Sequence, residues 1–240
     1  MNNAIVSPVN LPIIMPSNVL FVLSSADKTL TGAQTGWYLP EAAHPYYVLA
    51  PHTHIDFAAP KGPNPPIDEG SVKAFANDAQ CTKFLNDETV NSKLASAKKL
   101  SDINVKDYDA IFYVGGHAPV IDLASDPVNH KLASDFWNAG KIVSAVCHGT
   151  AALVGAVDAS GKSIFNGRSF TGFSNTEEEM AGKVKDVPFL LEDKISSLGG
   201  KYEKAAEPWG VKLVVDGKLI TGQNPASATS VGEAILKALS

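Results

Sequence analysis

An apolar run that ends abruptly in a cysteine constrains the fold of this chain more than any other segment. Residues 141–150 read KIVSAVCHGT, with small residues two positions before and two positions after Cys147. This pattern is typical of a nucleophile elbow, a tight strand-to-helix turn that presents a reactive side chain at the edge of a sheet. Such a turn places the cysteine at a helix N-terminus, where the dipole favours the thiolate, so we predict a lowered pKa for Cys147. The alternative is a buried structural cysteine.

The bulk properties of the chain are those of an ordinary globular protein. Its 240 residues are 45% hydrophobic and 19% charged, which allows one large or two small domains with a substantial core. A net charge of −5 and the lack of a basic cluster argue against a nucleic-acid partner. Cys81 and Cys147 are too few for a disulfide framework. Cys147, as a predicted reactive thiol, must stay reduced, which indicates a reducing compartment.

The N-terminal residues 1–17 are predicted to form an irregular arm. They contain no Lys or Arg and are interrupted by Asn and Pro, so they lack the charged start and unbroken apolar stretch of a secretory signal. No apolar run in the chain reaches the roughly 18–20 residues of a membrane span. We therefore predict a cytoplasmic protein with no membrane partner and a single domain over residues 18–240.

Four short apolar runs predict buried parallel strands, at residues 19–23, 55–58, 110–114 and 142–146. A helical segment at 127–139 lies between the last two, and this order forms a βαβ unit. Further along, Asp216-Gly217 between two apolar runs predicts a hairpin of residues 211–215 and 219–221. Residues 225–239 predict a final amphipathic helix. The predicted fold class is therefore α/β, with a mostly parallel sheet covered by helices on both faces.

A helical insertion separates the second of these strands from the third. Residues 60–66 are rich in Pro, Gly and Asn and predict a surface loop. The insertion follows at about residues 71–97, or 68–100 with its flanks. It is either a decorating subdomain or a lid or dimer element, and the sequence leaves both interpretations open.

Candidate functional residues are expected to meet beyond the carboxyl ends of the strands, where open α/β sheets bind ligands. Cys147 follows one strand and Gly115-Gly116-His117 follows another. His148 is the last histidine of the chain, which excludes enzymes whose catalytic histidine comes well after the nucleophile. The base must then be His148 or an earlier histidine, of which His117 is best placed. Paired glycines at 115 and 116 could direct backbone N–H donors at an oxyanion.

Carboxylates come from two further segments. Glu41 lies in a mostly apolar, aromatic sequence, which would raise its pKa and let it share a proton with a neighbour. The alternative is an exposed helix glutamate. Ser174 is a predicted helix N-cap, followed by three acids at residues 177–179 in the first turn. Their spacing alone does not choose among them.

Taken together, these motifs resemble the ThiJ/PfpI superfamily. The similar segments are AVCHG at 145–149, the Gly-Gly-His loop, TGWYLPEAAHP at 35–45, TGFS at 171–174 and TGQNPAS at 221–227. Within the superfamily the resemblance is closest to the heat-shock chaperone branch that carries glutathione-independent glyoxalase (glyoxalase III) activity. It runs from about Asn18 to the C-terminus. It implies a flavodoxin-like three-layer sandwich with a nucleophile elbow and a small helical insertion.

The resemblance also implies roles for individual residues. In that family the cysteine is the nucleophile and the histidine after it is the general base, which map to Cys147 and His148. The glutamate of the Thr-Gly motif lies near the cysteine and maps to Glu41. The remaining triad acid follows the Gly-Phe-Ser motif, and the count from Gly172 favours Glu178, with Glu177 and Glu179 as alternatives.

A metal or organic cofactor is not expected. Some family members carry a His/Glu metal site, and here His52, His54 and Asp56 alternate on a predicted strand, so their side chains would share one face. They show no clear match to the family's ligands. The chain also lacks a Gly-x-Gly-x-x-Gly or P-loop pattern.

The implied reaction converts the 2-oxoaldehyde methylglyoxal and water to D-lactate, and glyoxal to glycolate. The thiolate would form a hemithioacetal, and a base, either His148 or Glu41, would move a proton through an enediol. We expect His148 to move the carbon-bound proton and Glu41 to stabilise charge.

A homodimer is expected because the family commonly dimerises. The alternatives are a non-enzymatic stress chaperone or a cysteine redox sensor, and a thiol peptidase or amidase.

Overall fold

The computed structural model describes residues 16–240 of the chain. The predicted N-terminal arm, residues 1–17, lies outside this range except for its last two residues, and Ser17 already begins the first strand. Within the described range, every helix is too short or too polar to cross a lipid bilayer.

A seven-stranded sheet forms the centre of the molecule, in the order β3-β2-β1-β4-β5-β9-β8. Its strands are β1 (Ser17–Val22), β2 (Thr53–Ala59), β3 (Lys98–Lys99), β4 (Ala110–Tyr113), β5 (Ile142–Val146), β8 (Leu213–Asp216) and β9 (Leu219–Gly222). All neighbours are parallel except β8 and β9, which form the predicted hairpin. The predicted α/β class with a mostly parallel sheet is confirmed. A separate two-stranded sheet pairs β6 (Ser169–Phe170) with β7 (Lys201–Tyr202).

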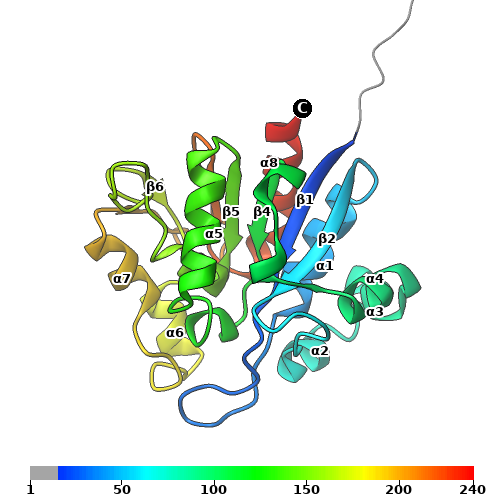
Figure 1. The fold of residues 1–240 in the computed structure, drawn as a ribbon. Coiled ribbons are helices and arrows are strands. Elements are labelled where there is room, and N and C mark those ends of the chain that lie inside the picture. Colours follow the sequence, from blue (N-terminus) through cyan, green and yellow to red (C-terminus); the bar gives the residue numbers. More distant parts are fainter. Residues whose placement is uncertain (1–15) are drawn as a thin grey trace, which may run out of the picture.

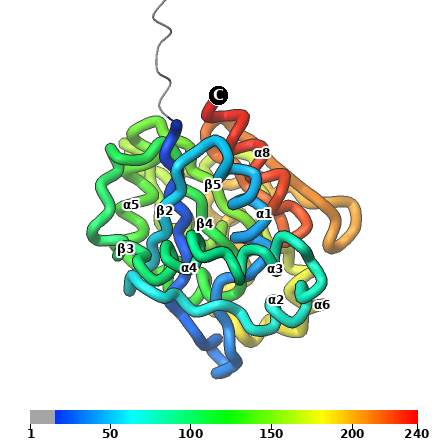
Figure 2. Tube along the Cα trace, turned by 90° about the vertical axis from the view of Figure 1, so that its right-hand side faces the viewer, coloured from blue at the N-terminus to red at the C-terminus, as the bar shows by residue number. Residues whose placement is uncertain are grey.

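Helices cover both faces of the large sheet, as Figures 1 and 2 show. Helix α5 (Pro127–Asn138) lies on one face, and α1 (Leu39–Leu49) and α8 (Ala228–Leu239) lie on the other. The strands β1, β4 and β5 lie between these helices and their central side chains are fully buried. Burial on both faces explains why these strands are continuous apolar runs rather than alternating patterns.

The segment of the predicted insertion contains three short helices rather than one continuous one. They are α2 (Glu69–Ala74), α3 (Ala79–Asn86) and α4 (Glu88–Ala95). Each begins after an aspartate whose side chain accepts a backbone N–H of the first turn: Asp68, Asp78 and Asp87. Helix α3 packs against α1, and α4 packs against β2. The remaining helices α6 (Asn175–Met180) and α7 (Leu191–Ser197) lie on the opposite side of the molecule in Figure 1.

Close packing between α1 and α8 fixes the position of α1. Gly232 of α8 faces α1, and a Cβ atom there would lie 2.9 Å from the Cα of Pro45 and 3.2 Å from the Cβ of Val48. A side chain at this position would therefore push the two helices apart. Since α1 also carries Glu41, this contact helps to set where that carboxyl group lies.

We predict that Gly232→Val lowers the free energy of unfolding by about 1–3 kcal/mol, because it overpacks the interface between α1 and α8. Urea unfolding followed by circular dichroism measures the change. Ala238→Val, at an exposed position of the same helix, is the control and should cost no more than about 0.7 kcal/mol. Equal losses in the two variants would contradict the packing argument.

Candidate active site

Cys147 lies on a strained turn directly after β5. The strand ends at Val146, and a 3₁₀ helix runs over Cys147–Leu153. The backbone of Cys147 has φ 55°, which is in the left-handed region that residues other than glycine rarely adopt. Two residues later, a Cβ at Gly149 would overlap the carbonyl oxygen of Tyr113 on β4. The predicted nucleophile elbow is confirmed. Gly149 has to lack a side chain because β4 passes so close to its backbone.

A chain of polar contacts runs from Cys147 to two histidines. The Sγ atom of Cys147 lies 3.5 Å from Nδ1 of His148. Nε2 of His148 is 2.5 Å from Oε2 of Glu178, and the other oxygen of Glu178 is 2.8 Å from Nε2 of His117. Glu178 therefore bridges the two imidazoles. Of the three acids that the sequence left open, Glu178 is at the site, and Glu179 is exposed.

The Glu178 carboxylate determines which ring nitrogens carry protons. Burial raises the pKa of Glu178, but the electrostatic effect of the His148 ring and the hydrogen bond from His117 offset this and hold the pKa well below its usual value. An ionised carboxylate only accepts hydrogen bonds, so Nε2 of each histidine donates. Burial, with a contribution from His148, lowers the pKa of His117 to about 4, so that ring is neutral at pH 7. When His148 is neutral too, its Nδ1 is unprotonated and faces the sulfur.

Glu177 has a different task from its neighbour. It forms a capping box with Ser174 at the start of α6. Its carboxylate also accepts hydrogen bonds from the side chains of Gln223 and Asn224, at 3.0 and 2.8 Å, and from the backbone N–H of Trp209 at 2.9 Å. Sequence reasoning missed this network. The TGQNPAS segment, noted only as a motif of the resemblance, was the available signal.

Glu41 is fully buried beside Cys147. It lies in the first turn of α1, and within residues 16–240 neither of its carboxyl oxygens has a hydrogen-bond partner of ordinary geometry. Burial raises its pKa to about 8, although the nearby Cys147 side chain and the backbone N–H groups of Gly116 and Gly115 act in the opposite direction. The predicted rise in the pKa of Glu41 therefore agrees with its surroundings, and the alternative of an exposed glutamate is wrong.

The prediction of a lowered pKa for Cys147 is wrong. Burial raises the pKa of the thiol well above its usual value, and the Glu41 carboxylate raises it further. The backbone N–H groups of His148 and Gly116 lower it, but by less. Local turn geometry suggested a thiolate, whereas desolvation in the folded site opposes one. Because the thiol and the carboxyl repel each other when both are ionised, we expect the pair to give up only one of its two protons as the pH rises past about 8.

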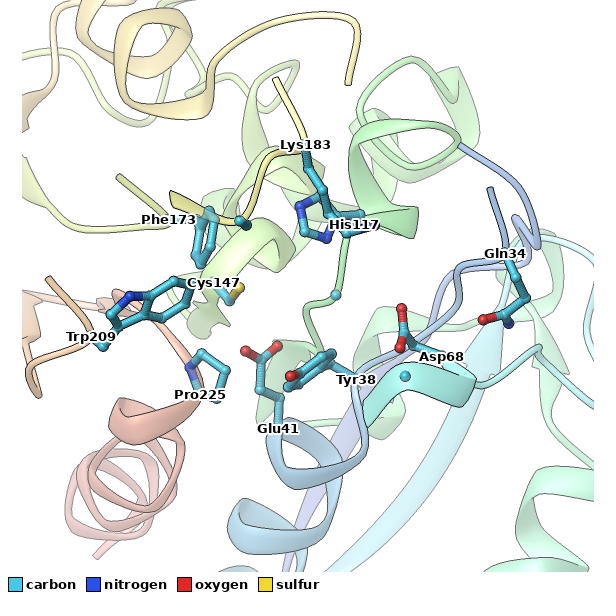
Figure 3. A pocket seen from close by; sticks show the side chains of 13 residues that line it. Gln34, Tyr38, Glu41, Asp68, His117, Cys147, Phe173, Lys183, Trp209 and Pro225 are labelled. Carbon is cyan, nitrogen blue, oxygen red and sulfur yellow. The ribbon is translucent and has the colours of Figure 1, made fainter. Parts of the chain in front are cut away.

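A small cavity of about 270 Å³ opens above the sulfur. Figure 3 shows the Glu41 carboxyl pointing toward Cys147, with Phe173 and Trp209 on one side and Tyr38 on the other. The full lining is Gln34, Tyr38, Glu41, Asp68, Gly70, Gly116, His117, Cys147, Phe173, Ala181, Lys183, Trp209 and Pro225. His148 is not part of this lining: its side chain is fully buried, and its ring packs against Phe173 at a centroid distance of 4.4 Å.

The Gly115-Gly116-His117 segment borders the cavity from the end of β4. Gly115 leaves room for Glu41, since a Cβ there would overlap the carboxyl oxygen Oε2. The backbone N–H of Gly116 lowers the pKa of both Glu41 and Cys147. The segment therefore brings backbone donors to the place where charge would develop. Whether they bind an oxyanion stays a prediction.

Two groups of side chains within residues 16–240 could hold a metal ion: His117, His148 and Glu178 at this site, and His44, Asp78 and Cys81 elsewhere. The first group is already joined by direct hydrogen bonds. The residues considered from the sequence are not grouped in this way. His54 is exposed, and Asp56 forms a 2.7 Å ion pair with Lys98.

Comparisons with known proteins agree with this architecture. The sequence model of the DJ-1/PfpI family matches residues 70–238. The glutathione-independent glyoxalase HSP31 of Saccharomyces cerevisiae is 32% identical over 93% of this chain and 98% of its own. Glyoxalase 3 of Candida albicans is 31% identical over 92% of this chain and 97% of its own.

Solved structures give the same result. The crystal structure of the rapid encystment protein REP24 of Francisella tularensis matches with a TM-score of 0.88 and 37% identity, over 93% of this chain and 99% of that one. The crystal structure of glyoxalase III from Candida albicans matches with a TM-score of 0.84 and 28% identity, over 92% of this chain and 97% of that one.

We predict that Glu41→Gln stabilises the protein, and more so as the pH rises from 5 to 7. The carboxyl takes up a proton on folding between its ordinary pKa of 4.5 and its folded value of about 8. Burial of this ionisable group therefore costs no stability at low pH, and it lowers the free energy of unfolding increasingly up to about pH 8. The stability difference should grow by about 1 kcal/mol per pH unit.

Denaturant unfolding at pH 5, 6 and 7 measures this difference. Glu233→Gln, which removes an exposed carboxyl from α8, is the matched control and should show no such trend. A stability gain that stays constant with pH, or a loss that grows, would contradict the assigned pKa of Glu41.

Proposed function

Because the chain belongs to the DJ-1/PfpI family, we propose that it is a glutathione-independent, cofactor-free glyoxalase that converts methylglyoxal and water to D-lactate, and glyoxal to glycolate. The observation that carries this proposal is that the buried Glu41 carboxyl, whose pKa is raised to about 8, lines the same small cavity as the sulfur of Cys147. Simple acyl transfer needs only a nucleophile, a base and an orienting acid. Glu41 is an additional acid–base group placed where a proton can be moved on the substrate.

In the first step the sulfur adds to the aldehyde carbon of methylglyoxal. The reactive form of the pair has lost one of its two protons to solvent and keeps the other on Glu41, so the sulfur attacks as the thiolate and a carbon–sulfur bond forms. The aldehyde oxygen becomes an alkoxide and takes the proton from Glu41, which gives a neutral hemithioacetal. The backbone N–H of Gly116 lies on this side of the cavity and would stabilise the charge as it forms.

In the second step Glu41, now ionised, removes the remaining hydrogen from the former aldehyde carbon. An enediolate forms, a proton passes between its two oxygens, and Glu41 returns its proton to the neighbouring carbon to give a thioester of lactate. A base with a pKa of about 8 is well matched to this task near neutral pH. From the sequence, His148 is the expected base for this proton. We assign it to Glu41 because Glu41 lines the cavity and His148 does not.

In the last step water attacks the thioester carbonyl, the carbon–sulfur bond breaks, and lactate leaves. The base that accepts the water proton must be close to the sulfur, and the unprotonated Nδ1 of His148 is 3.5 Å away. Glu178 holds His148 in this tautomer and stabilises the imidazolium that forms. His117 completes the arrangement by fixing the other oxygen of Glu178.

The cavity also weighs against a peptidase or amidase, because a volume of about 270 Å³ suits a three-carbon substrate better than a peptide chain. A stress chaperone or redox sensor would use the same cysteine without turnover. The D configuration of the lactate, the homodimer and the cytoplasmic location stay predictions.

We predict that the wild-type protein forms D-lactate from methylglyoxal without glutathione, and that Cys147→Ala lowers the rate at least about a thousandfold. Glu41→Gln should lower it by about 10²–10⁴-fold, because it removes the acid–base group but keeps the shape. An enzymatic D-lactate assay measures both effects, and Glu233→Gln should retain the wild-type rate. D-lactate production by folded Cys147→Ala protein would refute the mechanism through Cys147, and a wild type that forms no D-lactate would refute the proposal and favour the chaperone or sensor.

We predict that Glu178→Gln lowers the rate about a hundredfold or more, while Glu179→Gln leaves it unchanged. The amide that replaces Glu178 carries N–H groups, so one histidine must rotate or change tautomer. If His148 is the one that changes, a proton on its Nδ1 faces the sulfur and the ring can no longer act as a base. Similar rates for the two variants would show that the bridge between the histidines has no role in turnover.

A further inference from the structure

Three metal-ligating side chains meet on α1 and α3, outside the active site. His44 lies on α1, three residues after Glu41, and Asp78 and Cys81 are the N-cap and third residue of α3. One ligand atom from each lies within 4.8 Å of the other two. No step of the proposed reaction uses these residues.

The distances fit a tetrahedral metal ion. Nε2 of His44 is 3.1 Å from Oδ2 of Asp78 and 3.9 Å from Sγ of Cys81. A zinc ion at its usual bond lengths separates nitrogen from oxygen by about 3.3 Å and nitrogen from sulfur by about 3.6 Å. The three atoms therefore need only small movements to share one ion.

The surroundings of the three atoms suit a cation with an open coordination position. Cys81 is fully buried, whereas the side chains of His44 and Asp78 are 17% and 31% exposed. The sulfur thus lies at the bottom of the cluster, and the imidazole and carboxylate lie at its solvent side. Among the ion pairs of residues 16–240, Asp78 pairs with His44 and with no lysine or arginine.

A backbone contact orients the carboxylate for this purpose. Oδ1 of Asp78 accepts the backbone N–H of Cys81 at 2.8 Å, as the N-cap of α3. This hydrogen bond occupies one oxygen and directs the other, Oδ2, toward His44. Ligands that are oriented by a second hydrogen bond in this way are typical of protein metal sites.

We propose that His44, Asp78 and Cys81 form a binding site for a divalent cation of the zinc type, with water as the fourth ligand. The mixture of one thiolate, one imidazole and one carboxylate favours Zn²⁺ over Mg²⁺ or Ca²⁺, which prefer oxygen ligands. Binding releases the proton of the Cys81 thiol as the sulfur–metal bond forms. The ion would join α1 to α3 and so fix the inserted helices to the body of the domain. This inference does not depend on the proposed enzymatic activity.

Cobalt spectroscopy on the full chain tests the proposal, because Co²⁺ replaces Zn²⁺ and reports its ligands. After treatment with a chelator, titration with Co²⁺ should give a saturable sulfur-to-cobalt charge-transfer band at one equivalent, together with the visible bands of four-coordinate cobalt. Cys81→Ser should abolish the charge-transfer band. Cys147→Ser, the matched change at the chain's second buried thiol, should keep it.

Asp78→Asn provides a second variant in case Cys81→Ser does not fold. Asn retains the N-cap but is a much weaker ligand, so Co²⁺ should bind at least about tenfold more weakly. Zn²⁺ should raise the melting temperature of the wild type and not that of His44→Ala. The absence of a saturable band, or a band lost in Cys147→Ser and kept in Cys81→Ser, would overturn the proposal and, in the second case, move the ion to the active site.

Discussion

The active site depends on two buried acids that cannot both ionise. Glu41 and the thiol of Cys147 lie together below a small cavity, and burial raises the pKa of each. A carboxyl group with a pKa of about 8 still carries its proton at neutral pH, so it can supply that proton inside the cavity. The elbow backbone at Cys147, the space left by Gly115 and the packing of α1 against α8 all serve to hold this pair together.

Two neighbouring glutamates, Glu177 and Glu178, have different roles: one stabilises the structure around the cavity, and the other contacts the histidines of the site. Successive residues of a helix point in different directions, so Glu177 and Glu178 at the start of α6 reach different partners. Glu177 binds amide groups near the end of β9 and the backbone of Trp209, and so anchors the loop that lines the cavity. Glu178 binds the two histidines. Loss of the charge at Glu177 would disturb the site by destabilising this loop. Loss of the charge at Glu178 would disturb it by impairing proton transfer through His148.

The sequence predicted those features that depend on local pattern. Apolar runs located β1, β2, β4 and β5, and Asp216-Gly217 located the hairpin, because a buried strand and a tight turn each depend on residues that are adjacent in the sequence. Among the three acids the family motif favoured Glu178, but their spacing alone did not choose, because the choice depends on the position of α6 relative to β5. The pKa of Cys147 was predicted wrongly because desolvation comes from the whole fold, whereas the turn reports only the helix N-terminus. The division of the insertion into three helices could have been foreseen from the capping aspartates Asp78 and Asp87.

Helix α1 connects the active site to the proposed metal site. Pro45 lacks an N–H, so the carbonyl of Glu41 has no partner four residues later in the helix. The first turn of α1, which carries the acid, is therefore held by packing more than by its own hydrogen bonds. Gly232 of α8 packs against α1 at Pro45 and Val48, and the contact between His44 and Asp78 holds α1 on another side, both just after this first turn. A cation at His44 would replace a single hydrogen-bonded contact by three metal–ligand bonds one turn from Glu41, and so would make the helix that carries Glu41 more rigid.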